Sequence, residues 1–416
     1  PLIQDLRNEG LEVLLSDEPD KLPDFARDKG TLVVRTPAVP ADTAVLSYFM
    51  EHGHPILKRS ELLAQVSQGM RTIAVAGTHG KTTTSSMIAH ILTHSGHGCT
   101  AFIGGLMSGY ESNVLIDADS DWVVLEADEF DRSFHHLHPE IAVVTSVDPD
   151  HLDIYGDEAE FKAAFNTFVN GVEKSGTVFR FNEIPEFKAS ASQFSYGTSP
   201  SDFEVGNVHV KEGAFHFDLK APDRTIEDIT LPLPGRHNVW NAAASCSVAL
   251  KLGLSDTQVK EALKAYKGVK RRFEVHQRGP SVYFIDDYAH HPTEITACIQ
   301  AVRELYPGKR LTVAFQPHLF SRTKDFLTGF AKSLSLADEL ILLPIYPARE
   351  KPIPGITSEA LLEQATIANT VMCTKEELPS HIAELELEVL LVLGAGDIDR
   401  TIPLINSVLS ERNQDH

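Results

Sequence analysis

The sequence has little cysteine and no long apolar run. Its four cysteines are scattered singly over 416 residues and form no CxxC pair, which argues against both a zinc site and a disulfide framework. A reducing cytoplasm is the compartment that we expect for such a chain. No stretch free of charged residues is long enough to span a bilayer, so we expect no membrane protein.

Basic residues are also scarce. Lysine and arginine together number 37 against 58 aspartates and glutamates, so the formal net charge is −21. A nucleic-acid-binding surface needs a basic face to neutralise phosphates, and this charge balance argues against nucleic acid as a partner. We therefore expect small-molecule ligands. An anionic ligand would be held locally, by helix N-termini, single basic side chains or metal ions.

What the chain does contain is an alternation of apolar β-branched runs with helical patterns from residue 30 onward. This alternation predicts an α/β fold with largely parallel sheets. The length suggests roughly two to three domains, and we place the boundaries to give the blocks 1–67, 68–274 and 275–416. Within the second block, the alternating stretch GNVHVKEGAFHFDL predicts a β-hairpin.

A glycine loop stands between a strand pattern and a helix pattern near the start of the second block. Its residues are Gly77, Thr78, His79, Gly80, Lys81, Thr82 and Thr83. The backbone N–H groups of such a turn bind an anion, Lys81 adds a positive charge, and the Thr82 hydroxyl would bind a divalent cation. Val75 stands where the strict Walker pattern has glycine, so the match is partial. The combination nevertheless predicts nucleotide phosphate binding.

Acidic side chains follow the next apolar strand pattern, and these are Glu126, Asp128, Glu129 and Asp131. The carboxyl ends of parallel strands meet at one edge of a sheet, so these acids would lie beside the glycine loop. Two like charges about 4 Å apart repel by roughly 4 kcal/mol at an effective dielectric of 20. Carboxylates beside phosphates therefore indicate Mg²⁺ or Mn²⁺ between them. A solvated acidic loop is the alternative for any single acid.

Two more polar groups follow in the second block. The strand pattern PEIAVVTSV is followed by DPDHLD, in which His151 could complete the shell of a second metal ion. A turn or helix-capping role is the alternative for His151. Asn238 and Asn241 fall three apart at a predicted helix start, where amides on one face can bind a base edge. A helix cap is the alternative for Asn238.

The remaining candidates lie at the second boundary and in the third block. Arg272, in the basic run KRRF, could reach a phosphate when domains close, and a surface ion pair is the alternative. The motif DDYAHHP follows a strand pattern and contributes Asp287, Tyr288, His290 and His291. A structural histidine is the alternative for His291. After another strand pattern, His318 and Arg322 stand in FQPHLFSR, where Arg322 would provide a cation for a substrate carboxylate or phosphate.

Together these motifs resemble the Mur ligase family, the ATP-dependent ligases of bacterial cell-wall precursor assembly. The resemblance spans about residues 30 to 400 and is carried by GTHGKTTT, EADEFDRSF, DPDHLD, PGRHNVWNA, GVKRRFE, DDYAHHPTE, FQPH, YPAREKPIPG and GAGD. It implies three domains: a Rossmann-like domain for a UDP-sugar, a central P-loop ATPase domain, and a C-terminal Rossmann-like domain for the amino acid. The family opens with a glycine-rich fingerprint that is missing here, so we expect the first domain to be truncated.

The function that the resemblance implies is amide-bond formation. ATP would phosphorylate the lactyl carboxylate of UDP-N-acetylmuramate, and L-alanine would attack the acyl phosphate in peptidoglycan precursor synthesis. We expect ATP and Mg²⁺ or Mn²⁺ to be required, and the chain to be a cytoplasmic monomer or homodimer. Two alternatives stay open. One is a sister ligase that adds a tripeptide to UDP-N-acetylmuramate or glutamate to a folate, and the other is an ATP-dependent binding switch that joins nothing.

The resemblance also implies roles for the candidate residues. Lys81 would hold ATP phosphates, Thr82 and Glu126 would bind one Mg²⁺, and His151 would help to bind a second. His290 would accept the proton of the attacking amine. The residues that would contact adenine, ribose or phosphate are Asn238, Asn241, Arg272 and Asp287. The residues that would line the muramate and alanine side are Tyr288, His290, His291, His318 and Arg322.

Overall fold

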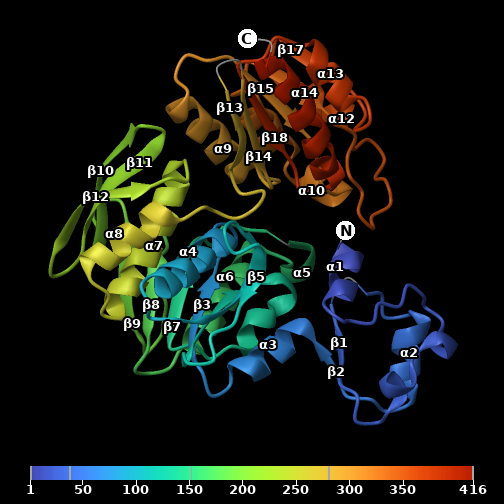
Figure 1. The fold of residues 1–416 in the computed structure, drawn as a ribbon, viewed down its shortest axis with the longest axis vertical. Coiled ribbons are helices and arrows are strands. Elements are labelled where there is room, and N and C mark those ends of the chain that lie inside the picture. Colours follow the sequence, from blue (N-terminus) through green and yellow to red (C-terminus); the bar gives the residue numbers. More distant parts are fainter. Residues whose placement is uncertain (1, 37–38, 151, 280–281, 415–416) are drawn as a thin grey trace.

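The N-terminal part of the chain forms a small parallel sheet. The computed structural model describes residues 2–36, 39–150, 152–279 and 282–414, and Figure 1 shows their arrangement. Strand β1 (Val33–Arg35) pairs with β2 (Ile56–Lys58). The helices of this part are α1 (Leu2–Asn8), α2 (Ala44–Glu51) and α3 (Arg59–Ser67). The last of them, α3, leads directly into the next sheet.

A ten-stranded sheet forms the middle of the chain, in the order β12-β11-β10-β9-β8-β7-β3-β6-β4-β5. Its strands are β3 (Arg71–Ala76), β4 (Thr100–Met107), β5 (Ser112–Leu115), β6 (Trp122–Ala127), β7 (Ile141–Val144), β8 (Thr177–Phe181), β9 (Ser192–Gly197), β10 (Phe203–Lys211), β11 (Ala214–Lys220) and β12 (Thr225–Leu231). The strands from β4 to β10 in this order are parallel, whereas β11 runs antiparallel to both β10 and β12, and β5 runs antiparallel to β4. The β10–β11 pair confirms the predicted hairpin.

A six-stranded sheet follows in the C-terminal part, in the order β13-β14-β18-β15-β16-β17. Its strands are β13 (Glu274–Arg278), β14 (Tyr283–Asp287), β15 (Leu311–Phe315), β16 (Glu339–Leu342), β17 (Asn369–Met372) and β18 (Val389–Leu393). Within this sheet, the β13–β14 pair is antiparallel and the other pairings of its described strands are parallel. The chain is thus an α/β protein with two large, mainly parallel sheets.

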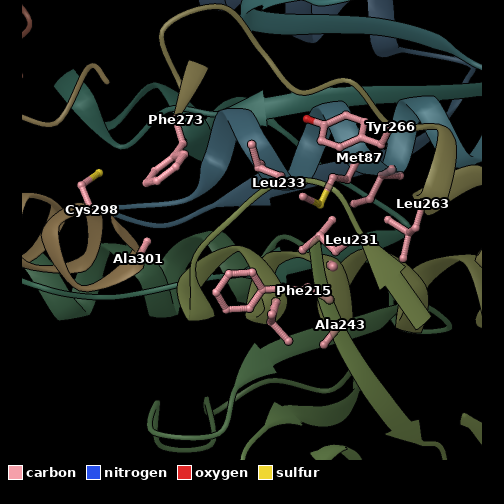
Figure 2. Packing of buried hydrophobic residues seen from close by; sticks show 14 of the residues in the cluster. Met87, Phe215, Leu231, Leu233, Ala243, Leu263, Tyr266, Phe273, Cys298 and Ala301 are labelled. Atoms are coloured by element: carbon pink, nitrogen blue, oxygen red, sulfur yellow. The ribbon is translucent and has the colours of Figure 1, made fainter. Parts of the chain in front are cut away.

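Helices cover both faces of the ten-stranded sheet. On one face lie α4 (Lys81–His94), α7 (Arg236–Lys251) and α8 (Asp256–Ala265), and their apolar side chains join Ile73 and Val75 of β3 in one buried cluster. On the other face, α6 (Glu158–Asn170) packs against Ala74 and Ala76. Successive strand residues point to opposite faces, which is why β3 serves both clusters. Figure 2 shows Met87, Ala243 and Leu263, one from each helix of the first face.

The apolar core continues from the ten-stranded sheet into the C-terminal part. Cys298 and Ala301 of α9 (Pro292–Leu305) belong to the same buried cluster as Met87 (Figure 2). The other helices are α5 (Leu152–Tyr155), α10 (Phe320–Asp325), α11 (Leu327–Leu334), α12 (Ser358–Leu362), α13 (Leu378–Glu384) and α14 (Ile402–Gln414). Within the described ranges, none of the helices combines the length and the apolar character that crossing a membrane requires.

We predict that Phe165→Ala lowers the free energy of unfolding by about 3–5 kcal/mol, because it opens a cavity in a packed aromatic cluster. Phe165 of α6 is fully buried, and its ring lies 5.3 Å from Phe134 and 5.2 Å from Phe161. Lys162→Ala, an exposed position on the same helix, is the control and should change stability by less than about 0.5 kcal/mol. Denaturant unfolding followed by fluorescence measures both, and equal stabilities would contradict this packing.

Candidate active site

The loops at the carboxyl ends of the middle strands line a cavity of about 740 Å³, here called the central cavity. Its lining combines the glycine loop, the loops after β6 and β7 and the start of α7 with segments of the C-terminal part. The predicted site residues that line it are Thr78, His79, Gly80, Lys81, Thr82, Thr83, Asn238, Asn241, Arg272, Asp287, Tyr288, His290, His291, His318 and Arg322. The structure therefore brings together residues that are more than 200 positions apart in the sequence.

The glycine loop connects the end of β3 to the start of α4. Gly77 has a φ of +140° and Gly80 a φ of +82°, which are backbone conformations that L side chains rarely adopt. At Gly77 there is also no space, because a Cβ atom would lie 2.1 Å from the Thr145 Oγ1. Since α4 begins at Lys81, this loop places a helix N-terminus next to the central cavity, where it can bind an anion.

Lys81 is neutralised by a buried carboxylate. Its Nζ lies 2.7 Å from Glu129 Oε2 and donates to the carbonyl of Gly77 at 2.6 Å. Burial lowers the pKa of Lys81, but the carboxylates of Glu129 and Asp128 outweigh that effect and the net shift is upward. The ammonium is therefore charged, and an incoming phosphate would compete with Glu129 for it.

Thr82 and Glu126 form a compact oxygen donor set. Thr82 Oγ1 donates to Glu126 Oε2 at 3.1 Å, and the other carboxylate oxygen accepts the backbone N–H of Gly104. Burial raises the pKa of Glu126, although the Gly104 hydrogen bond and Lys81 act against it. Hydroxyl and carboxylate oxygens are ligands that Mg²⁺ prefers, so this pair fits the predicted cation. His151, the predicted ligand of a second metal ion, lies outside the described residues.

Asn238 and Asn241 are buried in the first turns of α7. Asn238 Nδ2 donates to the carbonyl of Pro234 at 2.6 Å, and Asn241 Nδ2 donates to Asn238 Oδ1 at 3.2 Å. Asn241 Oδ1 in turn accepts from Thr84 Oγ1 at 3.1 Å, which connects α7 to α4. The alternative of Asn238 as a helix cap is wrong, because Gly235 precedes the first helical residue and Asn238 lies inside the first turn.

Asp287 and Arg272 lie together where the two large sheets are connected. The two oxygens of Asp287 accept the backbone N–H groups of Phe273 and Ala289, each at 2.7 Å. Burial raises the pKa of Asp287 to about 6. The Arg272 guanidinium lies 5.1 Å from the centre of the Tyr288 ring, and among the described residues it has no ion-pair partner. Arg272 is therefore a positive group that remains available to a ligand.

Three cavity-lining histidines of the C-terminal part, His290, His291 and His318, are neutral at pH 7. Burial lowers the pKa of His290, His291 and His318 to about 4 each. His291 caps α9, because its Nδ1 accepts the backbone N–H of Thr293 at 3.3 Å. The structural alternative for His291 thus has direct support, although its ring also lines the central cavity.

Arg322 has a protein partner that the sequence pattern does not indicate. Its Nη2 lies 3.1 Å from Asp150 Oδ2, and both side chains are largely buried. Asp150 follows β7 of the ten-stranded sheet, whereas Arg322 belongs to α10 of the C-terminal part. The prediction of Arg322 as a cation for a substrate is therefore modified, because a substrate anion would have to share it with Asp150.

Glu294 is the cavity residue that sequence reasoning missed. Its carboxylate contacts His79 of the glycine loop at 3.1 Å and accepts the backbone N–H of His290 at 3.0 Å. The only signal in the sequence was an acid in the first turn of a helix, which is a common and usually structural placement. The contact depends on how the two large sheets pack, and local sequence patterns carry no information on that.

Comparison with known proteins gives consistent matches to one family along nearly the whole chain. Residues 75–249 match the Mur ligase middle domain, and residues 271–396 match the Mur ligase glutamate ligase domain. A UDP-N-acetylmuramate–L-alanine ligase of Parabacteroides distasonis is 42% identical, over 99% of this chain and 90% of that protein. A protein of the same name from Flavobacterium psychrophilum is 45% identical, over 99% of this chain and 91% of that protein.

Solved structures have the same architecture. The UDP-N-acetylmuramate–alanine ligase of Thermotoga maritima superimposes with a TM-score of 0.82 at 27% identity, covering 99% of this chain and 90% of that one. A murein peptide ligase of Psychrobacter arcticus superimposes with a TM-score of 0.68 at 21% identity, covering 98% and 91%. The second similarity concerns the fold alone.

We predict that Gly77→Ala abolishes nucleotide binding, because the new methyl group collides with Thr145 and displaces the loop. Gly253→Ala is the matched control, since Gly253 also has a positive φ, of +87°, but has open space around it. Both substitutions carry a backbone penalty of about 1–3 kcal/mol, so a loss of stability does not by itself identify the collision. Calorimetric titration with ADP does, and undiminished affinity in Gly77→Ala would contradict the described loop.

Proposed function

Because the chain belongs to the Mur ligase family, we propose that it is an ATP-dependent ligase that joins L-alanine to the lactyl carboxylate of UDP-N-acetylmuramate in peptidoglycan precursor synthesis. The observation that carries the proposal is the similarity to relatives of that name along 99% of the chain. We also propose that residues 1–67, 68–274 and 275–416 act as UDP-sugar, ATP and amino-acid domains. The separate sheets of these three parts support that division.

The glycine loop and Lys81 would bind the ATP phosphates. The Lys81 ammonium is charged but paired with Glu129, so it would turn to the phosphates when they enter. Arg272 would add a second positive charge, since its guanidinium faces the central cavity without an ion-pair partner among the described residues. Such preorganised charges stabilise the transferring phosphoryl group. Asn238, Asn241 and Asp287 would contact the adenosine part from the cavity wall.

Thr82 and Glu126 would hold the Mg²⁺ that accompanies ATP. Their hydrogen-bonded oxygens are 3.1 Å apart, and desolvation raises the pKa of the half-buried Glu126 carboxyl, so a positive neighbour would favour its charged form. When bound, the cation would neutralise charge on the phosphates and so allow them to lie beside carboxylates. His151 remains the proposed ligand for a second ion.

The C-terminal part would complete the reaction. The lactyl carboxylate takes the γ-phosphoryl group as ADP leaves, and the amine of alanine then forms the C–N bond while phosphate departs. Arg322 would bind a substrate carboxylate in competition with Asp150. His290 is the proposed acceptor of the amine proton because its ring is neutral at pH 7. Burial lowers its pKa to about 4, which makes it a weak base that passes the proton on to solvent. Tyr288, His291 and His318 would line the same side.

A coupled assay tests the proposal. The protein is incubated with ATP, Mg²⁺ and UDP-N-acetylmuramate, together with L-alanine, glycine, L-serine, L-glutamate or a tripeptide, and both phosphate release and product mass are measured. We predict that phosphate release requires both the UDP-sugar and an amino acid, and is fastest with L-alanine. Release that needs neither would contradict a ligase and favour a binding switch. Faster ligation of the tripeptide or of glutamate would identify a sister activity.

The same assay tests the role of Lys81. Lys81→Met removes the ammonium next to the phosphates, and we predict that kcat falls by about 10²–10³-fold, as when one charge-stabilising donor is removed. Lys174→Met is the matched control, because Lys174 is exposed and lies away from the central cavity. Equal kcat values for the two variants would rule out the proposed role.

A further inference from the structure

One carboxylate connects the glycine loop to the C-terminal part. Glu294 lies in the first turn of α9, and its Oε1 is 3.1 Å from Nδ1 of His79. Its Oε2 accepts the backbone N–H of His290 at 3.0 Å and is 3.5 Å from His290 Nδ1. The Glu294 side chain is 16% exposed. The two carboxylate oxygens of Glu294 thus hold the glycine loop, which would bind the ATP phosphates, and the segment of His290, which would receive the amine proton.

His79 is held from both large sheets. Its Nε2 lies 3.4 Å from Oδ2 of Asp148, which follows β7, while Nδ1 faces Glu294 of α9. The His79 backbone N–H donates to Ser146 Oγ at 2.8 Å, so the loop itself is anchored to the ten-stranded sheet. The imidazole ring is therefore placed between one carboxylate from each side, immediately before Gly80 and Lys81.

This placement makes His79 a cation. Burial lowers the pKa of His79, but Asp148 and Glu294 outweigh it and raise the value to about 9. Burial raises the pKa of Glu294, but the hydrogen bond and charge of His79 and the charge of Arg272 act against it, and the net pKa lies well below the ordinary range. The other titratable ring beside His79 is that of His291, 4.8 Å away and neutral at pH 7. The contact is thus an ion pair under ordinary conditions.

We propose that Glu294 is a positioning residue that, through His79 and the backbone of His290, ties the glycine loop to the C-terminal part and aligns the phosphate and amine ends of the reaction. The expected effect on kcat rests on the proposed ligase function. The ion pair itself is a property of the protein without substrates. A separation of α9 from the glycine loop would take one of the two carboxylates away from His79, so the contact with Glu294 and the protonation of His79 favour each other.

The first test measures the titration of His79 by NMR in the full chain without nucleotide. We expect a midpoint near pH 9 in the wild type, and a midpoint lower by at least about one pH unit in Glu294→Gln, where one of two negative charges is gone. Glu304→Gln is the matched control. Glu304 also lies on α9, and its carboxylate forms an ion pair with Arg236 of α7 at 2.9 Å. This pair also connects the C-terminal part to the ten-stranded part, but it does not involve the glycine loop.

The second test measures kcat in the alanine ligation assay. We expect Glu294→Gln and His79→Gln each to lower kcat by about 100-fold, the effect of a misplacement on the order of 1 Å. The double variant should be no slower than either single one, because both remove the same contact. The alkaline limb of the kcat profile should move to lower pH in Glu294→Gln. Glu304→Gln should keep wild-type kcat and pH dependence.

The proposal is overturned if the titration midpoint of His79 is the same in Glu294→Gln as in the wild type. It is also overturned if Glu294→Gln keeps wild-type kcat, or if the losses of kcat in the two single variants add up in the double variant. Thermal unfolding checks that the variants are folded. If Glu294→Gln does not fold, the titration is repeated with Glu294→Asp, whose shorter carboxylate must also lower the midpoint. Failure of the wild type to ligate alanine would refute the proposed function alone, because the titration result does not depend on it.

Discussion

The structure depends on how negative charge is compensated at the carboxyl ends of its parallel strands. The chain carries a net charge of −21 and still concentrates acids around the central cavity. Four acids in the cavity lining or next to it have partners: Glu129 contacts Lys81, Glu126 contacts Thr82, Asp150 contacts Arg322, and Glu294 contacts His79. A buried carboxylate without such a partner would be costly. A polyanionic ligand would therefore use Arg272, which has no ion-pair partner among the described residues, replace one of these partners, or bring a cation with it.

The same pairs explain why both large sheets are needed. Two of them, Asp150–Arg322 and Glu294–His79, connect loops of the ten-stranded sheet to the C-terminal part. The apolar cluster that includes Met87 and Cys298 packs the two parts together (Figure 2), and the charged pairs then fix the lining of the cavity. Packing supplies most of the stability, whereas the ion pairs determine which groups face a ligand.

Local features of the fold and of the site could be predicted from the sequence. The glycine loop, the α/β alternation and the β10–β11 hairpin each depend on neighbouring residues, so the pattern indicated them. The edge strand β17, with the sequence NTVM, has no continuous apolar run that would indicate it in the sequence. The partners of His79 and Arg322 were missed for a different reason. They depend on how distant segments pack, and no spacing rule describes that.

The central claim is that carboxylates at the strand ends admit nucleotide phosphates only together with a divalent cation. Calorimetric titration of ATP into protein stripped with EDTA, and again after Mg²⁺ is restored, tests it most directly. Repulsion on the order of 4 kcal/mol for a single close pair of charges predicts that affinity falls by well over tenfold without the cation, since about 1.4 kcal/mol corresponds to tenfold. Equal affinity under the two conditions would contradict the account.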